Sequence, residues 1–357
     1  MRKDTIFFLS GCLLIALSGC GKDVSSLTVV TGVGIDGIEQ DYQITAEAIQ
    51  LTHSDEESQS ILLHAAGQSM TEGLNHTVPM TGRPLHCGHA QVLVIGHGTA
   101  SYGVESLLTD ILGDNSYPVS LLPVVAEHGA AEIMETKPVV GTLGSTELEK
   151  LVTRGQATCT NPAEPAVSFF QRVKAPGIEA VLPCVALRHN GETQVREIVG
   201  TAVFRDMRLK KILDVEESRA LMWMLGRRGG ELTVDGTLFR VVGNQRTLTA
   251  DTGSGTLRLR LDLQTYVPLD NPENWKQRVA LALRERCGGV MEQLRQAGCD
   301  AVGFGNLVYR RMPGDWAALQ EDWAVLFQDY PVTISVEIVS VREGRIETKT
   351  AGERMAP

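Results

Sequence analysis

Histidine and cysteine side chains gather in one short segment of the 357-residue chain, where they could bind a metal ion. His86, Cys87 and His89 lie within four residues of one another, and His97 follows nearby. On a β-strand, residues three apart point to opposite faces, so His86 and His89 would converge only across a turn. No acidic partner or second cysteine pair stands at a spacing typical of zinc sites. We therefore expect structural histidines and no metal site.

Two glycine-rich segments could allow a phosphate to approach the backbone. Gly32-Val33-Gly34 leads into a strand rather than a helix N-terminus, and Gly303-Phe304-Gly305 lacks the rest of a dinucleotide fingerprint. Close packing of a helix is the better interpretation for the second segment. The chain also has no G-x-S-x-G motif and no P-loop. We predict no catalytic residues, no cofactor and no enzymatic activity.

The N-terminal residues carry one chemically defined candidate site, Cys20. Arg2 and Lys3 precede the uncharged segment 6–17, which is typical of a secretion signal. The following tetrad Leu17-Ser18-Gly19-Cys20 resembles the bacterial lipobox, in which the cysteine receives a diacylglyceryl group. We expect residues 1–19 to be a lipoprotein signal peptide and 20–26 a tether. Two acyl chains would anchor the mature protein durably to the outer face of a membrane. An ordinary secretion signal with an incidental cysteine is the alternative.

Five cysteines remain beyond Cys20, an odd number that leaves at least one free thiol. Cys287 and Cys299 flank a segment that is mostly helical in pattern. A helix of that length would hold them roughly 18 Å apart, too far for a disulfide. We expect buried free thiols at Cys87, Cys159, Cys184, Cys287 and Cys299.

The composition is that of a globular protein, with 43% apolar residues and a formal net charge of −10. A protein that follows phosphate groups along nucleic acid needs a basic face, so nucleic acid is not an expected partner. Patterns of alternating and helical hydrophobicity run through the whole chain and predict an α+β or mixed α/β fold, with mixed and antiparallel sheets packed by helices.

Changes in pattern divide the mature chain into three expected domains. An N-terminal mixed α/β domain covers 27–176, a middle domain 177–252, and a C-terminal α+β domain 256–345. The glycine-rich segment 251–255 is the best linker candidate, and a charged tail follows from 346 to 357.

The middle domain contains the candidate interaction element. Asp214 and Glu217 have the spacing of a capping box that opens a helix. Glu216 and Arg219 then lie at i and i+3 on the side we expect to be exposed. They are candidates for a protein contact. Simple stabilisation of the helix by this ion pair is the competing explanation.

The C-terminal domain is expected to open with an alternating strand over 257–267 and a long helix over 273–297. A helix over 316–327 would follow, and a strand over 332–341 would close the domain. The helix over 316–327 carries one apolar stripe that we expect to be core, made of Trp316, Leu319, Trp323, Leu326 and Phe327.

Several segments in order along the chain together resemble the Ger(x)C family, the lipoprotein C subunits of spore germinant receptors. They are Val29–Asp36, Gly88-His89 with Val92–Gly96, Gly200–Phe204 with Leu213–Arg219 and Trp223, and Asp300–Gly305 with Arg310–Pro313, Trp316 and Trp323. One difference is that Gly21-Lys22 follows the cysteine here, where the family usually has a Trp-Asp pair.

This resemblance implies a three-domain, non-enzymatic subunit, lipid-anchored on the outer face of the spore inner membrane. Its implied partners are the membrane-embedded A and B subunits, with which it would support nutrient-triggered germination. Only Cys20 corresponds to a chemically defined site of the family. A lipid-anchored extracytoplasmic solute-binding protein is the alternative function, which would require two similar lobes with parallel sheets.

Overall fold

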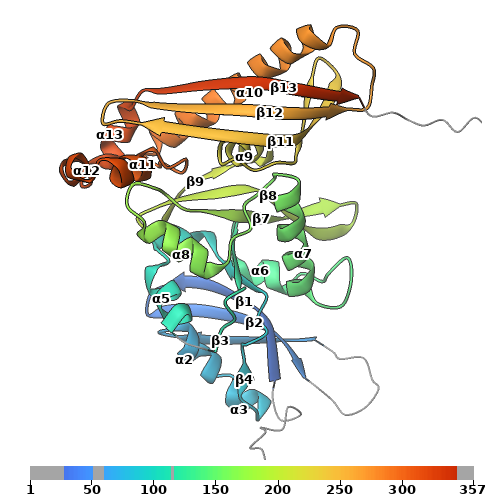
Figure 1. Ribbon diagram of the computed structural model, residues 1–357. Coiled ribbons are helices and arrows are strands. Elements are labelled where there is room, and N and C mark those ends of the chain that lie inside the picture. Colours follow the sequence, from blue (N-terminus) through green and yellow to red (C-terminus); the bar gives the residue numbers. More distant parts are fainter. Residues whose placement is uncertain (1–27, 51–59, 114–115, 344–357) are drawn as a thin grey trace, which may run out of the picture.

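The computed structural model describes residues 28–50, 60–113 and 116–343, which form two β-sheets packed by helices (Figure 1). The strands of the first sheet are β1 (Thr28–Ile38), β2 (Asp41–Gln50), β3 (Ser60–Gly67), β4 (Leu85–His86), β5 (Val92–Ile95), β6 (Leu122–Ala126), β7 (Val181–Asn190), β8 (Thr193–Arg205) and β9 (Arg208–Leu213). Those of the second sheet are β10 (Glu231–Val234), β11 (Thr237–Ala250), β12 (Gly255–Thr265) and β13 (Val332–Glu343).

The first sheet is mixed, with the order β3-β2-β1-β5-β6-β7-β8-β9 and β4 beside β1. Its centre, β1-β5-β6-β7, is parallel, and antiparallel meanders extend it at both ends. The central strands are buried on both faces, as parallel strands usually are. On β5, Val92 and Val94 face one core while Leu93 and Ile95 face the other.

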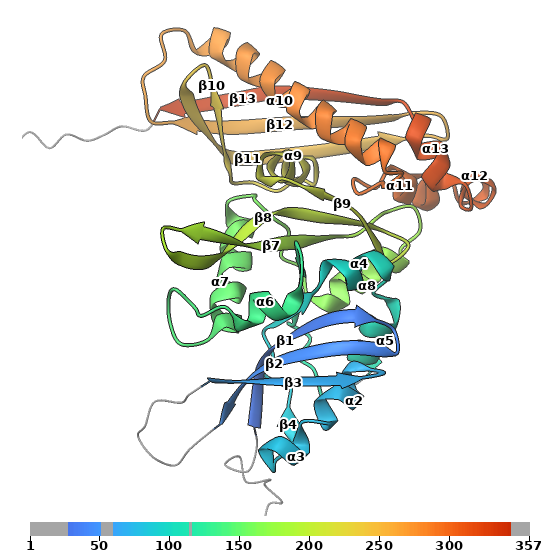
Figure 2. The ribbon, with the colours of Figure 1, turned by 180° about the vertical axis from the view of Figure 1, so that it is seen from behind.

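Helices cover both faces of the first sheet (Figure 2). Those in this part of the chain are α2 (Met70–Asn75), α3 (Val78–Thr81), α4 (His97–Tyr102), α5 (Glu105–Gly113), α6 (Ala130–Glu135), α7 (Gly144–Ala157) and α8 (Ala166–Lys174). The core under α6 and α7 is separate from the larger core formed with α2, α4, α5 and α8.

The second sheet is also mixed, because β12 pairs antiparallel with β11 but parallel with β13. The remaining helices are α9 (Val215–Met224), α10 (Pro272–Gln296), α11 (Phe304–Arg311), α12 (Pro313–Leu319) and α13 (Trp323–Asp329). On β12 a row of buried leucines alternates with exposed Arg258 and Arg260. The leucines face the core that α10 covers, so this sheet has one apolar and one polar face.

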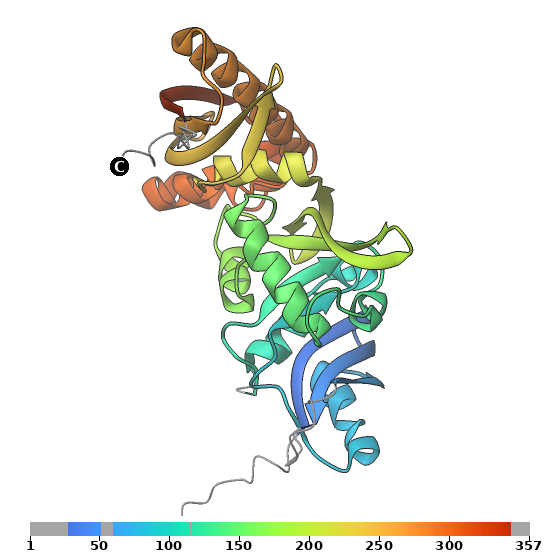
Figure 3. The same ribbon diagram turned by 90° about the vertical axis from the view of Figure 1, so that its right-hand side faces the viewer.

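Helix α9 lies between the two sheets (Figures 1 and 3). Its apolar side chains share one core with Val181, Val203 and Leu213 of the first sheet and with the leucines of β12. The segment 177–252 therefore contributes strands to both sheets. The sheets do not follow the expected boundaries at 176/177 and 252/256, and the division into three domains stays a prediction.

The α+β class with mixed sheets is confirmed. The two sheets differ in strand number and order, so they are not the similar lobes that the solute-binding alternative requires. Two local expectations are wrong. The segment 251–255 contains the tight turn of the β11–β12 hairpin, residues 251–254, rather than a linker, and the Asp251 carboxylate accepts hydrogen bonds from the backbone N–H groups of Gly253 and Ser254. The helix expected over 316–327 is two helices, α12 and α13, and the break leaves Leu326 exposed while Trp323 and Phe327 are buried.

Candidate interaction site

The helix that carries Glu216 and Arg219 begins where the sequence indicates. The Asp214 carboxylate accepts a hydrogen bond from the backbone N–H of Glu217 at 2.9 Å, and the Glu217 carboxylate accepts one from the N–H of Asp214 at 2.9 Å. This reciprocal capping box satisfies two backbone donors that would otherwise lack partners at the first turn of α9. The predicted capping box is confirmed.

Glu216 and Arg219 form a hydrogen-bonded ion pair on α9. The Glu216 side chain is 60% exposed but that of Arg219 only 19%, so the prediction that both lie on an exposed side is wrong for Arg219. The reason is that the aliphatic stem of Arg219 packs against the backbone of Gly230, at the start of the β10–β11 hairpin. Sequence spacing on α9 could not reveal this neighbour.

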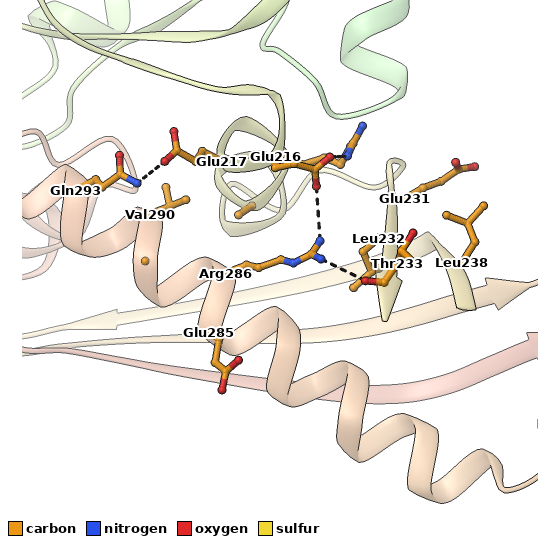
Figure 4. Close-up of a pocket in the computed structure, with 13 residues that line it drawn as sticks. Glu216, Glu217, Glu231, Leu232, Thr233, Leu238, Glu285, Arg286, Val290 and Gln293 are labelled. Carbon is orange, nitrogen blue, oxygen red and sulfur yellow. Dashed lines mark hydrogen bonds and ion pairs between the residues drawn. The ribbon is translucent and has the colours of Figure 1, made fainter. Parts of the chain in front are cut away.

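The pair borders a pocket of about 630 Å³ between α9, α10 and the β10–β11 hairpin (Figure 4). Ala220, Leu232 and Val290 form a buried apolar floor. Polar and charged side chains from the three elements form the rim. This combination of an apolar floor with a few polar groups is typical of sites that bind an amphipathic group.

Most charges on the rim already have partners within the protein. Arg286 lies 3.6 Å from the Glu216 carboxylate and donates to the carbonyl oxygen of Thr233 at 3.2 Å, while Gln293 donates to Glu217. Figure 4 shows the Glu216 carboxylate facing the Arg286 side chain. The residues that line the pocket include no cysteine, histidine or serine. Because most of the charged groups are already paired, the arrangement suits recognition of a partner group.

The histidines singled out from the sequence do not assemble into a site. The rings of His86 and His89 lie 5.7 Å apart at their centroids, and both residues are exposed. His97 lies on α4, next to Ser101. Among the residues that the structure describes, no group of three metal-ligating side chains occurs.

The glycine segments serve close packing. A side chain at Gly32 would collide with Ser145 of α7, and one at Gly34 with Met134 of α6. A side chain at Gly305 would overlap the Trp323 ring. The predicted close helix packing at Gly303–Gly305 is thus confirmed.

The lipidation candidate Cys20 lies outside the described residues. The five cysteines from Cys87 to Cys299 are buried and are not in disulfides, as expected. Burial raises the pKa values of Cys184, Cys287 and Cys299 to about 12 each, which keeps these thiols protonated and unreactive. None of the helices within residues 28–343 that the structure describes has the length and apolar character needed to cross a membrane.

Two carboxylates, one buried and one half-buried, were missed from the sequence as helix caps. The Glu47 carboxylate, on β2, accepts hydrogen bonds from the backbone N–H groups of Gly144 and Ser145 at 2.9 and 2.8 Å, and so caps α7. Asp36, on β1, caps α6 in the same way through Ala130 and Ala131. The partners are almost a hundred residues apart in sequence, so no local spacing signals these caps.

The junction between the two sheets holds a second set of missed charges. The Asp300 carboxylate is buried and accepts from the backbone of Gly303 and Gly305 at 2.7 Å each, yet burial still raises its pKa to about 6. Burial, aided by the nearby charges of Asp206 and Asp300, raises the pKa of Glu179 to about 8. Arg172 bridges the junction by donating to the carbonyls of Glu179 and Ala301.

Comparison with known proteins identifies the family. Residues 21–187 match the family model described as "Spore germination protein N-terminal domain", and residues 199–344 match "Spore germination B3/ GerAC like, C-terminal". The fold is similar to the crystal structure of the GerBC protein, with a TM-score of 0.51 and 15% identity over 86% of this chain and 97% of that one. No curated protein gave a significant sequence match. The chain therefore belongs to the Ger(x)C family, the C-subunit family of spore germinant receptors, and its role lies in spore germination.

Proposed function

We propose that this chain is the lipid-anchored C subunit of a germinant receptor, assembled with membrane-embedded A and B subunits on the outer face of the spore inner membrane. The observation that carries the proposal is the match of both family models in order along the chain, from 21 to 187 and from 199 to 344. A germinant receptor subunit implies a receptor complex and association with a membrane. The lipobox ending at Cys20 supports a lipid as the anchor.

The proposed role is protein contact and signal coupling, without catalysis. The family is one of receptor subunits and not a known enzyme family. Glu216 and Arg219, at the edge of the α9–α10 pocket, are proposed as part of a contact with another subunit. Stabilisation of α9 by the same ion pair remains the competing explanation.

The anchor is tested by metabolic labelling with a palmitate analogue in a sporulating host that carries the receptor. The wild-type chain should take up label and appear in the membrane fraction. Cys20→Ala should take up none and should accumulate as an uncleaved precursor, because the diacylglyceryl thioether can form only on the thiol. Cys12→Ala, inside the signal segment, is the matched control and should label normally. Label persisting on the Cys20→Ala chain would refute lipidation at this residue.

A further inference from the structure

The loop between α6 and α7 exposes two adjacent valine side chains. Its backbone is held by the Glu147 carboxylate, which is paired with the buried Arg196 side chain. The side chains of Val139 and Val140 are 58% and 73% exposed. Their backbone N–H groups both donate to one carboxylate oxygen of Glu147, at 2.7 and 3.1 Å. The loop stands out from the side of the molecule beside α6 and α7 in Figures 1 and 2.

The Glu147 carboxylate is itself held in place. Its other oxygen accepts from Arg196 Nη1 at 2.7 Å, and the Arg196 side chain is only 1% exposed. Arg196 also donates to the carbonyls of Ile133 and Thr136, at the end of α6. The Arg196 guanidinium, from β8, therefore connects the end of α6 to the first turn of α7 and, through Glu147, to the middle of the loop.

This arrangement is unusual for an exposed loop, whose backbone groups normally bond to water. A loop that is already ordered loses little conformational entropy when it binds a partner. The two branched apolar side chains remain in water on this fixed backbone, a cost that binding would remove. The loop thus has the two properties of a pre-formed docking element, which are a rigid backbone and exposed apolar side chains.

We propose that Val139 and Val140, named here the valine knob, insert into an apolar socket rimmed by basic groups on a membrane-embedded receptor subunit. The proposal rests on the proposed function for the existence of such a subunit. The basic rim follows from charge complementarity, since α6 places exposed Glu132 and Glu135 before the loop, where the exposed basic side chains are Lys137 and His64, which lies 3.8 Å from Glu135. The same acidic surroundings disfavour an anionic lipid surface as the occupant.

The test uses the full-length chain in a sporulating host, co-purified with epitope-tagged A and B subunits. Val139→Ser together with Val140→Ser should lower the recovered membrane subunits by about tenfold or more, since burying one valine is worth at least that factor. The melting temperature should stay within about 2 °C of wild type, because both side chains are exposed. The matched control is Val119→Ser with Val325→Ser, two valines elsewhere in the chain that are 82% and 66% exposed. This control should leave recovery unchanged.

A photo-cross-linking amino acid in place of Val140 identifies the occupant directly. An adduct with the A or B subunit supports the valine knob, whereas an adduct with lipid overturns it in favour of a membrane contact. Equal recovery of membrane subunits with the wild-type and double-serine chains would overturn the valine knob alone. If the wild-type chain recovers neither subunit, the proposed function fails, and the valine knob fails with it.

Discussion

Both ends of the molecule have apolar cores, but their helices are attached to the sheets in different ways. At the first sheet, charged side chains on the strands bond to the ends of helices. Asp36 accepts hydrogen bonds from the N-terminus of α6 and Glu47 from that of α7, and Arg196 bonds to both helices. At the second sheet, leucines of β12 pack against α10, and the aromatic rings of α11, α12 and α13 pack against one another in tilted and edge-on pairs.

The difference shows what each kind of contact provides. Burial of apolar area supplies most of the stability of a fold but is not directional. A buried ion pair often adds little net stability, yet removing one partner is costly and the pair fixes geometry. The first region thus holds individual backbone segments, including the loop of the valine knob, in defined positions.

The largest expected effect comes from removing an aromatic ring in the second region. Trp323 contacts Trp316 and Tyr330 with ring centroids 5.5 and 5.1 Å away, and its Nε1–H donates to Asp300 at 3.3 Å. Trp323→Ala should lower the free energy of unfolding by about 3–5 kcal/mol. Urea unfolding of the chain beginning at Gly21 measures this effect, and Leu326→Ala on the same helix is the control, with little expected change because Leu326 is exposed. Unchanged stability with germination lost would make Trp323 a partner contact instead.

A slightly smaller loss of stability should follow from breaking the buried ion pair between Arg196 and Glu147 in the first region. Arg196→Met leaves the Glu147 carboxylate, 11% exposed, without its cation, and we expect a loss of about 3 kcal/mol. The backbone amides of Val139 and Val140 should also exchange faster with deuterium, because the loop loses its anchor. Arg188→Met breaks a comparable ion pair with Glu127 that is far more exposed, and should cost less than about 1 kcal/mol. Equal losses of stability for the two substitutions would contradict the larger contribution that we assign to the buried Arg196–Glu147 pair.

The junction between the regions should make stability depend on pH. The pKa of Glu179 is about 8 in the folded chain and near its ordinary value after unfolding. The folded state therefore binds an extra proton between about pH 4.5 and 8, so the free energy of unfolding falls as pH rises through that window. Between pH 6.5 and 8, the free energy of unfolding of the wild-type chain should fall by up to about 2 kcal/mol because of Glu179, and Glu179→Gln should remove this fall. Parallel slopes for wild type and Glu179→Gln would refute this, and exposed Glu192→Gln serves as the control.

The smallest effect on stability is expected at the α9 pair. Glu216→Lys with Arg219→Glu keeps opposite charges at i and i+3 but places a lysine beside Arg286, so we expect a loss below about 1 kcal/mol. The equivalent swap of Glu292 and Arg295 on α10 is the matched control. If the α9 pair is a subunit contact, co-purification of the membrane subunits should fall for the first swap only. Normal recovery and germination with both swaps would leave helix stabilisation as its role.

Features encoded by neighbouring residues could be predicted from the sequence. The capping box of α9 and the alternating leucines of β12 each depend on spacings of two to four residues, and both are confirmed. The turn at 251–255 was mistaken for a linker because hairpin turns and linkers share the same small, flexible residues.

Features that depend on distant partners could not be predicted. Glu47 is one of several polar residues that alternate along β2, and no local pattern marks it as a helix cap before the fold brings the N-terminus of α7 to it. Arg196 likewise acquires its role only where α6 and α7 meet β8. The α9–α10 pocket was missed for the same reason, since α10 begins about fifty residues after α9 ends and no local pattern links them.

The parallel pairing of β12 with β13 also determines when the second sheet can fold. Arg260 and Glu337, paired side by side, are separated by 77 residues that include α10 to α13. Closing so long a loop is slow, and the edge of β12 that pairs with β13 in the folded chain has no partner there until β13 has been synthesised. A ribosome that stalls before residue 332 would therefore release a chain with an unpaired edge at β12, which is a substrate for proteases and for aggregation.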